Sequence, residues 1–154
     1  PTPYPRKKEA RRRLVVLERL LEYRRVLAPQ ATLRLRTDSQ PLRDFALTQL
    51  DLAGYEVTWA SDDERAERPD EPTSEYELRL VEAGAKVLGL WATPGNDPGD
   101  VEQSASLSLA DYLPEDLFAG AYVPHGMQGT IINLRNRHLH ASGPKAEALG
   151  PRPR

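Results

Sequence analysis

Helical and strand-like hydrophobic patterns alternate along the first 93 residues of this sequence. Apolar residues three and four apart indicate helices that bury one face, whereas strict apolar–polar alternation indicates half-buried strands. Alternation of the two patterns predicts an α/β layered fold, in which crossover connections pack helices against a sheet. The expected order is a helix at 11–28, a strand at 31–37, a helix at 41–53, a strand at 55–60, a short helix at 74–83 and a strand at 85–92.

Capping and breaking residues indicate where these helices begin and end. Ser39 followed by Pro41 predicts the start of the second helix, because a serine hydroxyl caps free N–H groups and proline suits the first turn. Gly54 and Gly84 predict the ends of the second and third helices. The apolar stripe of the first helix consists of Val16, Leu20, Tyr23 and Leu27, is widened by Leu14, Leu17 and Leu21, and ends before Pro29.

The remainder of the chain divides into three further segments. Residues 94–105 are rich in Pro and Gly and are interpreted as a linker, and 106–140 as an extension that docks on the rest of the chain. Residues 141–154 are expected to be disordered. In the extension, apolar residues indicate a docking segment, a turn is expected at 123–127, and 130–140 fits either a strand or a helix. The apolar residues are Leu107, Leu109, Tyr112, Leu113, Leu117 and Phe118.

The charge of the chain is unevenly distributed. Residues 1–37 carry a net charge of +8 and residues 38–154 a net charge of −10, although the total is only −2. A basic block beside an acidic body indicates contact with a polyanion, and the alternative is a solvated terminus. The chain has no cysteine and no apolar run near the ~20 residues of a membrane span, which fits a cytosolic protein and excludes a transmembrane helix.

Four local motifs follow one another in a characteristic order. They are Thr2-Pro3-Tyr4-Pro5-Arg6-Lys7-Lys8, then Arg11-Arg12-Arg13, then Arg36-Thr37-Asp38-Ser39, and finally Ser74-Glu75-Tyr76-Glu77. Over residues 1–93 this arrangement resembles the C-terminal half of the bacterial tRNA (guanine-46-N7)-methyltransferases. The resemblance implies an α/β fold that forms the second half of a class I (Rossmann-like) S-adenosylmethionine-dependent methyltransferase sheet, with residues 94–154 as a C-terminal extension.

The resemblance also implies a function, and it implies that the cofactor is bound by another part of the fold. The full-length parent would transfer a methyl group from S-adenosylmethionine to N7 of a guanine in tRNA in the cytoplasm. In that fold the glycine-rich cofactor loop lies upstream, and no glycine precedes Gly54 here. We therefore expect that the main cofactor site lies outside this chain and that the chain alone is inactive. Met127 is the only methionine, which indicates a fragment or a processed chain.

The family motifs assign roles to individual residues. Thr2 stands at the position of the family's catalytic aspartate, and Asp38 and Glu77 are the other catalytic candidates. Guanine N7 attacks through a lone pair and has no proton to lose, so carboxylates would stabilise developing positive charge and accept the N1–H and N2–H donors. The implied substrate-binding residues are Arg6, Asp38, Ser74, Glu75, Tyr76 and Glu77, and the implied RNA-binding residues are Lys7, Lys8, Arg11, Arg12 and Arg13.

Other interpretations remain open from the sequence. Asp38 could help to cap the following helix, Glu77 could be a surface charge and Tyr76 a core residue. Trp59 and Trp91 are expected in the core. No metal site is expected, because the His138-x-His140 pair lacks further ligands.

For the whole chain, a non-catalytic RNA-binding protein of the same fold is the alternative function, motivated by Thr2. An α/β interaction domain is the third. The other departures from the family pattern are Tyr4, Glu9, Ser39 and Ser74.

Overall fold

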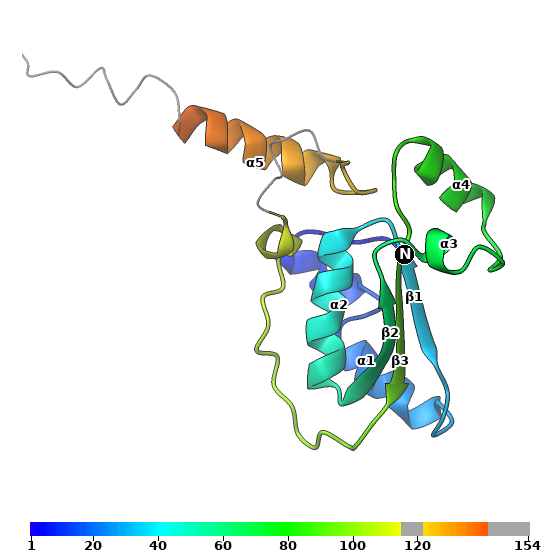
Figure 1. The fold of residues 1–154 in the computed structure, drawn as a ribbon. Coiled ribbons are helices and arrows are strands. Elements are labelled where there is room, and N and C mark those ends of the chain that lie inside the picture. Colours follow the sequence, from blue (N-terminus) through cyan, green and yellow to red (C-terminus); the bar gives the residue numbers. More distant parts are fainter. Residues whose placement is uncertain (115–121, 142–154) are drawn as a thin grey trace, which may run out of the picture.

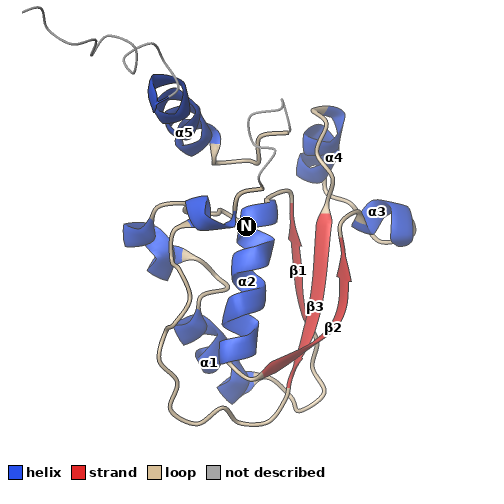
Figure 2. Cartoon of the chain, turned by 60° about the vertical axis from the view of Figure 1, so that its left-hand side comes forward, coloured by secondary structure: helices blue, strands red, loops and turns tan. Residues whose placement is uncertain are grey.

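A three-stranded sheet forms the centre of the computed structural model, which describes residues 1–114 and 122–141. Its strands are β1 (Leu33–Thr37), β2 (Tyr55–Ser61) and β3 (Leu88–Pro94), in the spatial order β1-β3-β2. Because β3 is antiparallel to both neighbours, β1 and β2 run in the same direction and are joined by a crossover through a helix. The expectation of an α/β fold is confirmed (Figure 2).

Helices α1 (Leu17–Val26) and α2 (Gln40–Leu52) cover one face of the sheet (Figure 2). The predicted cap of α2 is confirmed: the Ser39 hydroxyl accepts a hydrogen bond from the Leu42 N–H at 3.3 Å. Gly54 follows α2 with φ +73°, a backbone conformation that glycine adopts without steric cost. The two layers enclose an apolar core that includes Leu20, Leu35, Phe45, Leu50, Leu90 and Ala92.

The first helix begins later than expected. Instead of a continuous helix at 11–28, the chain forms a short 3-10 helix, η1 (Lys7–Arg12), and then an extended segment before α1. Residues 15–17 are all buried, whereas Leu14 is 59% exposed. Three successive buried residues do not fit a helix that packs through one face. The first N–H of α1 donates to Gln49 Oε1 on α2 at 2.8 Å, so a tertiary contact decides where the helix starts.

Two short helices lie at the end of the sheet where β1 and β2 finish (Figure 1). They are α3 (Glu64–Glu67), in the segment between the strand expected at 55–60 and the helix expected at 74–83, and α4 (Glu75–Glu82), which ends before Gly84 as predicted. The strand expected at 85–92 begins only at Leu88. The preceding carbonyl, that of Val87, accepts the backbone N–H of Glu64 at the start of α3 at 2.8 Å and does not pair with a strand residue.

The sheet face opposite α1 and α2 carries two tryptophans. Trp59 and Trp91 are half-buried, with ring centroids 5.1 Å apart. The Arg34 and Arg68 guanidinium groups lie 4.1 and 4.2 Å from the Trp91 ring centroid. The expectation that both tryptophans belong to the core is therefore wrong. Alternation along β3 places Trp91 on the outer face, and the register shift between Val57 and Trp59 brings Trp59 opposite Trp91 on that face. Arginine guanidinium groups cover the rings there through cation–π contacts.

The C-terminal extension returns to the same core. Residues 95–105 form no helix or strand, and they lead to a 3-10 helix, η2 (Leu109–Tyr112), and then to α5 (Gln128–Ala141). Leu109, Met127 and Ile131 are at most 1% exposed and join the core cluster. The segment that fitted either a strand or a helix is thus helical, and the extension contributes to the core that α2 builds.

Part of the extension lies outside the described residues. Leu117 and Phe118, predicted as docking residues, belong to this part, as do residues 142–154 of the predicted tail. Among the helices at 1–114 and 122–141, none has the length and apolar character that spanning a membrane requires.

Candidate functional site

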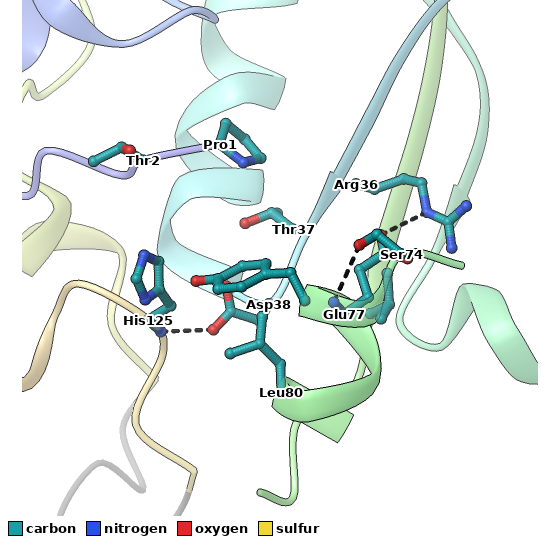
Figure 3. Close-up of a pocket in the computed structure, with 11 residues that line it drawn as sticks. Pro1, Thr2, Arg36, Thr37, Asp38, Ser74, Glu77, Leu80 and His125 are labelled. Atoms are coloured by element: carbon teal, nitrogen blue, oxygen red, sulfur yellow. Dashed lines mark hydrogen bonds and ion pairs between the residues drawn. The ribbon is translucent and has the colours of Figure 1, made fainter. Parts of the chain in front are cut away.

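A pocket of about 420 Å³ opens at the end of the sheet where β1 finishes and β3 begins (Figure 3). Thr2, Asp38, Ser74, Tyr76 and Glu77 line it. They come from the N-terminal segment, the end of β1 and the first turn of α4. Three segments that the sequence analysis singled out separately therefore meet at one site.

Asp38 follows β1 directly and is held by the C-terminal extension. Its Oδ2 accepts the backbone N–H of His125 at 2.6 Å and the hydroxyl of Tyr122 at 2.9 Å. Asp38 does not cap α2, since that position is taken by the Ser39 hydroxyl. Burial, followed by the hydrogen bond to Asp38, raises the pKa of the Tyr122 phenol, so this hydroxyl stays protonated and donates.

The first turn of α4 places Glu77 at the pocket. The Ser74 hydroxyl accepts the Glu77 N–H at 3.2 Å and caps the helix. The Glu77 side chain is only 18% exposed, and its Oε1 lies 3.1 Å from Arg36 Nε (Figure 3). Glu77 is therefore an ion-paired carboxylate on the pocket wall and not a solvated surface charge. Glu75, by contrast, is exposed and does not line the pocket.

Arg36 joins Glu77 to a second, buried carboxylate. Glu64 Oε2 lies 3.3 Å from Arg36 Nε, and the Glu64 side chain is 3% exposed. Burial raises the pKa of the Glu64 carboxyl, with repulsion by Glu77 acting in the same direction and attraction by Arg36 opposing it. Arg36 Nη1 also donates to the Pro72 carbonyl at 2.9 Å. Residues in the β2–α4 connection thereby fix the guanidinium that orients Glu77.

Two ring side chains form another part of the pocket. Tyr76 is 49% exposed, so it is not a core residue. Its ring meets the His125 ring edge to face, with centroids 5.5 Å apart. The sequence analysis missed His125 and Tyr122 as site residues. The available signal was weak: a histidine in a predicted turn, with nothing in the sequence to connect that turn to Asp38.

The N-terminal segment brings Thr2 to the rim but directs Arg6 elsewhere. Thr2 also lines a neighbouring hollow, and Arg6 lies in that hollow and not in the Asp38 pocket. Arg6 pairs with Glu9, with Nη2 and Oε1 2.9 Å apart. The predicted contact of Arg6 with the same nucleotide as Asp38 thus requires a substrate that spans both hollows.

Arg13 is not available to RNA, which corrects its predicted role. Its side chain is fully buried, Nε donates to the Pro3 carbonyl at 3.0 Å, and Nη2 donates to the Tyr4 carbonyl at 2.7 Å. The guanidinium carbon lies 4.5 Å from the Phe45 ring centroid. Burial lowers the pKa of Arg13 to about 10, so the group remains a cation at neutral pH. Arg13 therefore holds the N-terminal segment in place.

The other basic residues of the N-terminal block face solvent. Lys7, Lys8, Arg11 and Arg12 are exposed on or next to η1, and the Arg12 guanidinium lies 4.5 Å from the Tyr4 ring centroid. These four cations can reach a polyanion without losing a buried contact.

Comparison with known proteins identifies the family. A family model with the description "Putative methyltransferase" matches residues 1–90. The chain belongs to this methyltransferase family. The resemblance inferred from the motifs is confirmed by relatives that carry the name tRNA (guanine-N(7)-)-methyltransferase. Those of Limosilactobacillus fermentum and Lactiplantibacillus plantarum are 30% and 32% identical over 92 and 84 residues, or 58% and 53% of this chain. The relative from Lactobacillus johnsonii is 31% identical over 96 residues.

The chain spans 43% and 39% of the length of the first two relatives. A methyl donor such as S-adenosylmethionine is implied for a methyltransferase, and the described residues do not fit its glycine-rich loop. Gly54 and Gly84 follow helices, and the turn from β1 into α2 contains Asp38 and Ser39 but no glycine. Among the side chains that the structure describes, no three His, Asp or Glu form a group suited to a metal ion.

Proposed function

We propose that the full-length protein containing this chain is a cytoplasmic tRNA (guanine-N7)-methyltransferase that uses S-adenosylmethionine as its methyl donor. The observation that carries the proposal is the meeting of Asp38 with the Ser74–Glu77 turn in one pocket. Both segments belong to motifs that resemble the substrate-contacting motifs of the family. The pocket offers two carboxylates and an aromatic ring, which suit a guanine base that has left its stack.

Each pocket residue has a chemical task in this proposal. Asp38 accepts the N1–H and N2–H donors of guanine through Oδ1, because Oδ2 already accepts two hydrogen bonds and one carboxylate oxygen has two lone pairs. Tyr76 contacts the base, and Glu77, oriented by Arg36, stabilises the positive charge that develops on the ring as N7 is methylated. No group needs to remove a proton from N7, which attacks through its lone pair. Positioning of the base and electrostatic stabilisation of the developing charge are thus the contributions of this chain.

The exposed cations at η1 serve as the tRNA backbone contact. Lys7, Lys8, Arg11 and Arg12 face solvent near the segment that carries Thr2. Neutralising phosphates releases counterions, so the affinity for tRNA falls steeply as the salt concentration rises.

We further propose that the three strands are the second half of a class I methyltransferase sheet and that the cofactor-binding half precedes them in the full-length protein. This is supported by the family match to residues 1–90 and by the share of the relatives' length that the chain covers. Calorimetric titration with S-adenosylmethionine tests it: the full-length protein should bind, and residues 1–154 alone should not.

Methylation of tRNA by the full-length protein is the decisive assay, with 7-methylguanosine measured by mass spectrometry after nuclease digestion. Asp38→Asn and Glu77→Gln are each expected to reduce kcat/KM by about 10²-fold, the usual scale for losing one preorganised electrostatic group. Glu82→Gln is the matched control, because this exposed glutamate ends the same helix. Absence of 7-methylguanosine above background in the wild type would refute the proposal.

The second candidate is a non-catalytic RNA-binding protein, favoured by Thr2 in the pocket at the position of the family aspartate. A hydroxyl supplies no fixed negative charge. This candidate predicts salt-sensitive tRNA binding without methylation, and formation of 7-methylguanosine by the wild type excludes it. Thr2→Asp measures how much activity that position controls.

A further inference from the structure

The turn at 122–127 reaches the pocket from outside the part of the chain that matches the family. The family model covers residues 1–90, yet Tyr122 and His125 both contact Asp38. His125 also lines the pocket, whereas Tyr122 contacts Asp38 from an adjoining hollow, so the C-terminal extension contributes to the surroundings of the site. Neither the family match nor the motifs assign a role to this segment.

Several contacts hold the turn against the pocket. Met127 is fully buried, and its sulfur lies 3.5 Å from the Ser39 hydroxyl oxygen at the start of α2. Gly126 has φ +75°, and a Cβ at this position would lie 3.0 Å from the Pro3 side chain. The turn thus packs between the start of α2 and the N-terminal segment, and a side chain at position 126 would require Pro3 to shift.

The two hydrogen bonds to Asp38 fall on the same oxygen. The Tyr122 hydroxyl and the His125 N–H both donate to Oδ2, at 2.9 and 2.6 Å. Two donors of fixed position hold the carboxylate in one orientation. Among the described residues, no hydrogen bond to Oδ1 is present, so this oxygen remains available to a ligand. The two donors thus orient the Asp38 carboxylate and leave Oδ1 able to accept a hydrogen bond from a ligand.

The imidazole of His125 contributes a second feature. It lines the pocket (Figure 3). Its ring meets the Tyr76 ring at an interplanar angle of 83°. The Tyr76 ring, which belongs to the family motif, therefore packs against the His125 ring of the extension. This contact limits the positions that a planar base can take in the pocket.

We propose that residues 122–127 complete the base site, with Tyr122 and the His125 amide positioning Asp38 and the His125 ring fixing Tyr76. Tyr122 is thus a positioning residue: by orienting Asp38 it sets the preference for guanine over a purine without the N2 amino group. The His125 ring contributes affinity for any purine. The inference rests on the proposed function, because it assumes that Asp38 reads the donors of guanine.

Binding of guanosine 5′-monophosphate and inosine 5′-monophosphate to the full-length protein, measured by NMR titration, separates these roles. Inosine lacks the N2 amino group, so the ratio of the two dissociation constants reports how well Asp38 is placed. The wild type should prefer the guanine nucleotide by about tenfold, the order of one hydrogen bond to a charged group. Tyr122→Phe should bring the ratio close to one. His125→Ala should weaken both nucleotides several-fold and keep the ratio.

Tyr23→Phe is the matched control. The Tyr23 hydroxyl donates to the Leu14 carbonyl at 3.0 Å, so the variant also loses one hydroxyl-to-oxygen hydrogen bond but does not touch the pocket. It should leave both dissociation constants unchanged. Melting temperatures of all variants identify any loss of folding.

The outcomes separate this inference from the proposed function. If Tyr122→Phe lowers the melting temperature but keeps the wild-type ratio, the role of Tyr122 is structural only and the inference is overturned, while the proposed function stands. If the wild type binds neither nucleotide or does not distinguish them, Asp38 does not read guanine, and both the base site and this inference are refuted.

Discussion

Replacement of Arg13 by methionine tests whether this arginine is a structural cation and not an RNA contact. Its Nε donates to the carbonyls of Pro3 and Tyr4, both at 3.0 Å, and its Nη2 donates to Tyr4 at 2.7 Å. Tyr4 has φ +46°, a left-handed conformation that is unfavourable for a bulky residue. Arg13 therefore pins a strained segment that carries Thr2 to the pocket.

The loss in the free energy of unfolding that Arg13→Met causes can be estimated from the polar groups that lose their partner. Each buried carbonyl without its donor costs about 1–3 kcal/mol. Loss of the cation–π contact with Phe45 adds about 1–2 kcal/mol. Relief of the buried charge, which the lowered pKa of Arg13 reflects, offsets part of this. We expect a net loss of about 2–4 kcal/mol in the free energy of unfolding.

Urea denaturation followed by tryptophan fluorescence measures this loss, and Arg12→Met is the matched control. Arg12 is exposed and contacts the Tyr4 ring, so its replacement should cost less than about 1 kcal/mol. In tRNA binding the order should reverse: Arg12→Met lowers the slope of log affinity against log salt concentration by about one, whereas Arg13→Met leaves it unchanged. Equal stability losses for the two variants, or a changed slope for Arg13→Met, would refute the reasoning.

Three further predictions concern the surroundings of the pocket. Ser74→Ala removes the cap of α4 and should destabilise the protein by about 1 kcal/mol, measured by urea denaturation. Burial raises the pKa of Glu64, so this group favours the folded state below the ordinary glutamate pKa of 4.5 and loses that contribution as the pH rises through its folded pKa. Glu64→Gln should therefore gain stability relative to the wild type between pH 4 and pH 7, as read from paired melting curves; a constant difference would contradict this. Gly89→Ala places a Cβ 2.5 Å from the Trp59 ring and 2.9 Å from Glu64 Oε2. It should lower the free energy of unfolding by about 1–3 kcal/mol and alter tryptophan fluorescence. Unchanged stability would show that the Trp59 ring moves freely.

Much of the local structure could be predicted because it depends on neighbouring residues. Ser39 and Pro41 at the start of α2, Gly54 at its end and Gly84 after α4 act within one turn of the chain, and the structure shows each of them in its predicted place. The motifs around Asp38 and Ser74–Glu77 were likewise readable in the sequence, since they consist of adjacent residues.

Errors arose where a distant residue decided the outcome. The start of α1 depends on Gln49, and the burial of Arg13 depends on the carbonyls of Pro3 and Tyr4 and on the Phe45 ring. A run of three arginines looks uniformly solvated in sequence. Only the tertiary structure shows that the Arg13 side chain is buried while those of Arg11 and Arg12 are exposed.

The sequence by itself determined the alternation of helices and strands, the family motifs and the basic N-terminal block, because these are properties of local residue order. Only the tertiary structure decided that Asp38 and Glu77 line one pocket and that Tyr122 and His125 hold Asp38 in place. The physical reason is that a hydrogen bond between residues more than 80 positions apart depends on how the core packs the extension against α2. No pattern within either segment encodes that contact.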